Sequence, residues 1–156
     1  MINTCYTYKG KQAAASTTIS LHPWSDGVAL RILIVDDDPA ICSMLKTMLT
    51  MKGHRVETYL DPTATPIIQA PVCPCPCEAT CTDVMLIDYF MPQMNGLEFL
   101  RLLEGRGCKV PRQRMAVITA HYSAQLGHEL DQLGVKYFKK PFKLPELNGW
   151  LAGCAS

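Results

Sequence analysis

Three aspartates stand where short apolar segments of the sequence end. Asp36 and Asp37 follow the segment Arg31 to Val35, and Asp88 follows a second segment that begins at Val84. Carboxylates a few ångströms apart repel one another and raise each other's pKa, whereas a hard divalent cation bound between them removes this repulsion. The acids share one site if the two segments are neighbouring parallel strands. Their placement predicts a site for magnesium (Mg²⁺), or for manganese (Mn²⁺), rather than three ordinary turn residues.

The segments around these acids alternate between strand and helix patterns. Arg31 to Val35 predicts a buried strand, and Asp38 and Pro39 are typical of a helix N-cap and a first helical residue. Apolar residues then recur at helical spacing up to Gly53, which is placed to end that helix. Further strands are predicted at 55–60, 84–87, 115–119 and 135–138, and further helices from 61, 96, 123 and 145. The helix from 61 is expected to be short or irregular, because two prolines interrupt it.

This alternation predicts an α/β fold for residues 28–156. Right-handed connections place helices on both faces of a parallel sheet, so the expected architecture is a three-layer, doubly wound sheet of five strands. Residues 1–27 have no sustained periodicity and are expected to form a loosely ordered leader. Ligands of such sheets bind beyond the carboxyl ends of the strands, where the strand order reverses. The aspartates are expected at that place.

Four motifs in order resemble the receiver domain of two-component response regulators, the family that includes the chemotaxis regulators, over about residues 29–151. They are ILIVDDDPAI at 32–41, LIDYFMPQMNGLEFL at 86–100, AVITA at 116–120 and YFKKPF at 137–142. The resemblance implies a flavodoxin-like sheet of strand order 2-1-3-4-5. It also implies a regulatory phosphoacceptor rather than an enzyme.

The resemblance further implies a role for each polar residue in these motifs. Asp88 would accept a phosphoryl group, and it would also bind the metal ion together with Asp37 and the backbone carbonyl of Phe90. Asp36 would support the metal, commonly through water.

The hydroxyl of Thr119 and the ammonium of Lys140 would bind the phosphoryl oxygens, which carry the negative charge of the transfer. Movement of Thr119 toward the phosphate would then free space into which Tyr137 turns. The phosphate donor would be a histidine kinase or a phosphotransfer protein. The signal would pass to a downstream protein at the surface formed by residues 119–151.

Length and charge exclude several other classes of function. A chain of 156 residues has room for about one domain, so no DNA-binding effector is expected in it. A net charge of +1 gives no field that attracts nucleic acid or a membrane surface. The sequence has no apolar run long enough to span a bilayer and no apolar segment typical of a signal peptide, so the expected location is the cytoplasm.

The cysteines are the part of the sequence that the family pattern does not explain. Four of the eight lie in a Cys/Pro-rich loop at 71–82: Cys73, Cys75, Cys77 and Cys81. Four thiolates suit zinc or an iron–sulfur cluster, and reactive thiols suit a redox sensor. However, a Cys-x-Cys segment with an intervening proline favours an extended chain whose two sulfurs lie apart, which favours an inert reduced loop. The other four are expected to be unrelated to this loop: Cys5, Cys42, Cys108 and Cys154.

The position of this loop in the chain predicts where it lies on the sheet. A helix-to-strand loop lies at the amino ends of the strands, about 16 Å from the phosphoacceptor across a five-residue strand. The loop is therefore not expected to take part in phosphotransfer.

Two other classes of function stay open from the sequence. One is a haloacid-dehalogenase-like phosphatase, because Asp36 and Asp38 form an Asp-x-Asp motif after an apolar strand. Ala40 departs from the Thr or Val usual in that motif. The other is a metal or redox sensor built from the cysteine loop on a receiver scaffold.

Overall fold

The computed structural model describes residues 29–73, 75 and 79–155. The predicted leader at 1–27 lies outside the described residues, as does Cys77. Within the described part, five strands form one sheet: β1 (Arg31–Val35), β2 (Arg55–Tyr59), β3 (Val84–Asp88), β4 (Met115–Thr119) and β5 (Lys136–Lys139). All neighbouring strands pair in parallel, in the order β2-β1-β3-β4-β5. The predicted fold class and strand order are confirmed.

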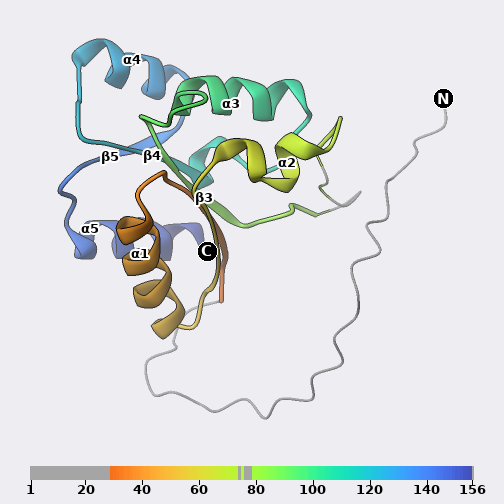
Figure 1. Ribbon diagram of the computed structural model, residues 1–156. Coiled ribbons are helices and arrows are strands. Elements are labelled where there is room, and N and C mark those ends of the chain that lie inside the picture. The colour runs from red at the N-terminus through yellow and green to blue at the C-terminus, as the bar shows by residue number, and fades with distance from the viewer. Residues whose placement is uncertain (1–28, 74, 76–78, 156) are drawn as a thin grey trace, which may run out of the picture.

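Helices cover both faces of this sheet. They are α1 (Pro39–Met51), α2 (Pro66–Gln69), α3 (Gly96–Gly105), α4 (Ala124–Gln132) and α5 (Leu144–Cys154), with short 3₁₀ turns at Pro62–Ala64 and Arg112–Arg114. Figure 1 shows α1 and α5 on one face and α2, α3 and α4 on the other. No helix in the described part of the chain is long and apolar enough to cross a membrane.

Local sequence signals account for most helix boundaries. Asp38 caps α1 by accepting hydrogen bonds from two backbone N–H groups of its first turn, and Gly53 follows the helix with φ +88°. Asn95 and Glu98 form a capping box at the start of α3. Ser123 caps α4 as predicted. The predicted irregularity after β2 is confirmed, because the helical segment is split into a 3₁₀ turn and the four-residue α2.

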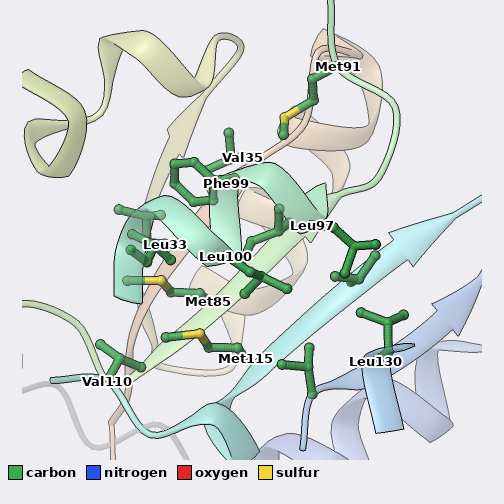
Figure 2. Packing of buried hydrophobic residues seen from close by; sticks show 14 of the residues in the cluster. Leu33, Val35, Met85, Met91, Leu97, Phe99, Leu100, Val110, Met115 and Leu130 are labelled. Carbon is green, nitrogen blue, oxygen red and sulfur yellow. The ribbon is translucent and has the colours of Figure 1, made fainter. Parts of the chain in front are cut away.

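The sheet is buried on both faces, so the core has two halves. Alternate residues of β1 point to opposite sides: Leu33 packs with the residues of α3, and Ile34 packs with those of α1 and α5. Figure 2 shows the first half, in which Phe99 and Leu100 of α3 lie against the sheet. This two-sided burial fixes the strands, and with them the side chains at their carboxyl ends.

Candidate functional site

The three aspartates of the motifs converge at the carboxyl edge of the sheet. One carboxylate oxygen from each of Asp36, Asp37 and Asp88 lies within 4.8 Å of the other two. They come together because β1 and β3 are neighbours, with Val35 opposite Ile87 at the ends of the two strands. Asp36 and Asp88 are buried, whereas Asp37 is exposed.

Lys140 joins the two buried carboxylates. Its Nζ lies 2.6 Å from Oδ1 of Asp88 and 2.9 Å from Oδ2 of Asp36. The backbone of Lys140 is held at the carboxyl end of β4, because its N–H donates to the carbonyl of Thr119 over 2.7 Å. One ammonium is thus shared by two carboxylates in a largely buried position.

Burial and this ion pair shift two pKa values. Burial raises the pKa of Asp88, although the hydrogen bond from Lys140 opposes the shift. For Lys140, burial alone would lower the pKa, but the hydrogen bonds to Asp88 and Asp36 outweigh it and raise the pKa. The lysine therefore stays charged and neutralises one of the two acids.

The other predicted site residues lie around Asp88. The backbone N–H of Phe90 donates to Oδ2 of Asp88 over 2.9 Å, and the exposed Phe90 ring meets the His121 ring edge to face at 5.6 Å. Thr119 is fully buried, and its hydroxyl bonds both the carbonyl and the N–H of His121 at 3.1 Å. The Thr119 hydroxyl thus stabilises the turn after β4 through these two hydrogen bonds.

Tyr137 of β5 lies on a different part of the surface. Its ring stacks on that of Tyr122 at 4.8 Å, with 22° between the ring planes. Tyr122 in turn lies over α4, where a Cβ on Gly127 would come within 2.2 Å of its hydroxyl oxygen. Because Gly127 has no side chain, the Tyr122 ring can pack directly against α4 while it stacks on Tyr137.

The carboxylates suit a hard divalent cation. The site holds three carboxyl groups and one ammonium, so its acids outnumber its cation by two, which a divalent cation can balance. The donors are all oxygen atoms, which magnesium prefers over nitrogen and sulfur. Asp36, Asp37 and Asp88 are therefore the residues that would hold such an ion.

Comparison with known proteins identifies the family. The model of the response regulator receiver domain matches residues 32–151. The chain belongs to this family. The receiver domain is 34% identical to the response regulator MprA of Mycobacterium tuberculosis over 121 residues, which are 77% of this chain and 48% of that protein. MprA of Mycobacterium avium is 34% identical over 119 residues, 76% of this chain and 47% of that protein. The receiver chain thus spans about half the length of these relatives.

Solved structures agree with this assignment. The non-phosphorylated HemR receiver domain of Leptospira biflexa superposes with a TM-score of 0.66 at 25% identity, covering 81% of this chain and 94% of that one. The chemotaxis protein CheY4 of Vibrio cholerae gives a TM-score of 0.61 at 25% identity, covering 80% of this chain and 97% of that one. The chain is therefore regulatory in kind, as a receiver domain of a two-component response regulator.

The structure corrects two predictions about the cysteines of this receiver domain. One sulfur from each of Cys73, Cys75, Cys81 and Cys108 lies within 4.8 Å of the other three, so Cys108 is not unrelated to the loop. The sulfurs of Cys73 and Cys75 are 3.1 Å apart rather than separated. The prediction overlooked that side chains two residues apart in an extended chain point to the same side, so that their sulfurs can converge. Cys77 falls on a residue that the structure does not describe.

Sequence reasoning also missed the partner of Tyr137. Tyr122 follows Thr119 and His121 in the loop after β4, and no motif marked it. The only local signal was Gly127 inside α4, which is consistent with close packing by a bulky neighbour.

Proposed function

We propose that this receiver domain accepts a phosphoryl group on Asp88 from a phosphohistidine of a histidine kinase or a phosphotransfer protein. The observation that carries the proposal is the convergence of three carboxylates and the Lys140 ammonium at one edge of the sheet. Asp88 is the proposed acceptor because it ends β3, the middle strand of the sheet, and contacts both Lys140 and the backbone N–H of Phe90, while Asp36 and Asp37 follow the adjacent strand β1.

The chain's own residues support the transfer step. An Asp88 carboxylate oxygen forms the new O–P bond, the P–N bond to histidine breaks, and the histidine nitrogen keeps the electron pair and takes up a proton. Negative charge on the peripheral phosphoryl oxygens is then met by Lys140, which is already 2.6 Å from the acceptor. A magnesium ion at Asp36 and Asp37, with Asp88 and the Phe90 carbonyl, would supply further positive charge at those oxygens.

Output follows from rearrangement around Thr119. Its hydroxyl leaves the turn of His121 to bond a phosphoryl oxygen, and the loop that carries Tyr122 shifts with it. Tyr137, stacked on Tyr122, then changes position. This alters the surface formed by residues 119–151, where a downstream protein binds. The proposed location is the cytoplasm, because its reducing conditions suit the free thiols of the described cysteines.

The test is phosphorylation by a small donor. The full chain is incubated with acetyl phosphate and Mg²⁺, and the intact mass is measured. We expect one phosphoryl adduct on the wild type and on Asp131→Asn, a matched loss of an exposed carboxylate on α4, and none on Asp88→Asn. An adduct of equal yield on Asp88→Asn would contradict the proposal.

The phosphatase alternative has less support. That mechanism needs the second acid of the Asp-x-Asp pair to be available for catalysis. Asp38 instead accepts hydrogen bonds from the N–H groups of Ala40 and Ile41 as the N-cap of α1. Turnover of a phosphate ester that is unaffected by Asp88→Asn would favour the phosphatase.

A further inference from the structure

Four cysteines form a second group of potential ligands, separate from the aspartates. Cys73, Cys75 and Cys81 lie in the loop between α2 and β3, and Cys108 follows α3. Each offers a sulfur within 4.8 Å of all the others, and all four are free and half-buried. Two sulfurs bound to one zinc ion at about 2.3 Å can lie at most about 4.6 Å apart, and about 3.8 Å in an ideal tetrahedron. To enclose one ion, the Cys73–Cys75 pair, whose sulfurs are 3.1 Å apart, would widen toward this distance, and any pair near 4.8 Å would close slightly.

We propose that Cys73, Cys75, Cys81 and Cys108 bind a single zinc ion as a tetrahedral tetrathiolate site. Four sulfur donors select a thiophilic metal, and zinc is the usual ion in closed sites of four cysteines. The spacing fits one ion rather than a cluster of several irons and sulfides. The sulfurs of Cys73 and Cys75, at 3.1 Å, are also well beyond the length of a disulfide bond, about 2.05 Å.

Contacts around the cysteines hold this arrangement in place. The backbone N–H of Cys73 donates to the carbonyl of Arg106 over 2.8 Å, which ties the loop to the end of α3 next to Cys108. The guanidinium of Arg106 reaches back to the carbonyl of Ile67 in α2 at 2.9 Å. The backbone N–H of Cys81 lies 3.4 Å from the sulfur of Cys75, a contact of the kind that supports metal-bound thiolates.

The other side of the loop is fixed to β1. Arg31 donates to the carbonyl of Cys81 at 3.3 Å and forms an ion pair with Asp83 at 2.7 Å. Its positive charge lies close to a site that carries two net negative charges when four thiolates bind one Zn²⁺. A cavity of about 260 Å³, lined in part by Arg31, Pro66 and Cys81, borders the cluster at Cys81.

The site has a structural purpose in this fold. In the four-residue α2, Ile67 is buried and Ile68 is partly buried against the core, so the apolar packing of this helix on the sheet rests on two side chains. A zinc ion would link the loop before β3 to the end of α3 across the amino edge of the sheet. Asp88 lies at the opposite edge, so the ion takes no part in phosphotransfer.

Metal analysis of the purified chain tests the site. The protein is kept reduced, incubated with Zn²⁺ in the presence of excess Mg²⁺, freed of unbound metal and analysed for zinc per chain. We expect one zinc per chain in the wild type and in Cys154→Ser, a buried cysteine of α5 on the other face of the sheet. We expect loss of stoichiometric zinc in Cys108→Ser. The inference does not depend on phosphorylation, so Asp88→Asn should keep its zinc.

A Co²⁺ titration keeps the test decisive if Cys108→Ser fails to fold. The wild type should develop the visible and near-ultraviolet absorption of tetrahedral cobalt–thiolate at one equivalent, and Cys108→His should bind with shifted bands. The proposal is overturned if the reduced wild type takes up no stoichiometric zinc or cobalt. It is also overturned if folded Cys108→Ser binds zinc as tightly as the wild type, or if the native protein releases iron and sulfide.

Discussion

Replacing Lys140 by methionine should destabilise the metal-free protein and strengthen its binding of Mg²⁺. Methionine keeps most of the side-chain volume, so the main change is loss of the positive charge. Asp36 and Asp88 would then be two buried carboxylates without a counter-charge. The same loss removes a side-chain cation that contacts both carboxylates and opposes binding of a metal ion between them.

The geometry sets the magnitude. With an effective dielectric constant of about 20, the contacts at 2.6 and 2.9 Å correspond to roughly 6 kcal/mol of attraction each, before the cost of desolvating the three groups. After that cost, removal of one partner from a buried ion pair lowers the free energy of unfolding by about 3 to 5 kcal/mol. For a chain of this size the melting temperature should fall by roughly 6 to 20 °C. The Mg²⁺ dissociation constant should fall at least about tenfold, which is about 1.4 kcal/mol.

Denaturant unfolding in EDTA and in saturating Mg²⁺ measures both effects, together with a calorimetric Mg²⁺ titration. Lys139→Met is the matched control, since it removes an exposed ammonium one residue away and should change stability by no more than about 0.5 kcal/mol. Mg²⁺ should restore part of the stability of Lys140→Met. An unfolding free energy equal to that of the wild type in EDTA, or an unchanged Mg²⁺ affinity, would refute the reasoning.

Three further outcomes are expected. Gly96→Ala places a Cβ 2.9 Å from the backbone oxygen of Asp88, so it should lower the unfolding free energy by about 1 to 3 kcal/mol and slow phosphorylation. The Cβ of the control Gly105→Ala meets nothing within 4 Å, so this variant should be neutral or stabilising. Denaturant unfolding measures the stability of both variants, and intact mass measures their phosphorylation. Burial lowers the pKa of His54, whose Nδ1 accepts a backbone hydrogen bond, so the imidazole binds a proton more readily in the unfolded chain than in the folded one. The free energy of unfolding should therefore fall as the pH drops through about 6.5. His54→Gln should reduce this pH dependence of the unfolding free energy. With free zinc at 100 times its dissociation constant, the wild type should be about 2.7 kcal/mol more stable to unfolding than after a chelator has removed the zinc. The same chelator should not change the stability of Cys108→Ser.

The two proposed metal sites use opposite edges of one sheet. The aspartates lie at the carboxyl ends of β1 and β3, whereas the cysteines precede β3 and β4. Oxygen donors at the first and sulfur donors at the second select different ions. A chelator selective for zinc should therefore change stability without preventing phosphorylation in Mg²⁺.

The sequence by itself determined the strands, most helix boundaries and the presence of three aspartates together at the carboxyl edge. Apolar runs, caps such as Asp38 and Ser123, and glycines that end helices are short-range signals that act within a few residues. The aspartates could be placed together because every parallel strand ends at the same edge.

Only the tertiary structure decided which distant side chains meet. Cys108 joins Cys73 because α3 returns past the loop before β3 and its end hydrogen-bonds to that loop. Tyr122 covers Gly127 and stacks on Tyr137 because α4 and β5 pack side by side. These contacts depend on the path of the chain between elements, which local periodicity does not specify, so the cysteine pattern alone left Cys108 out of the group.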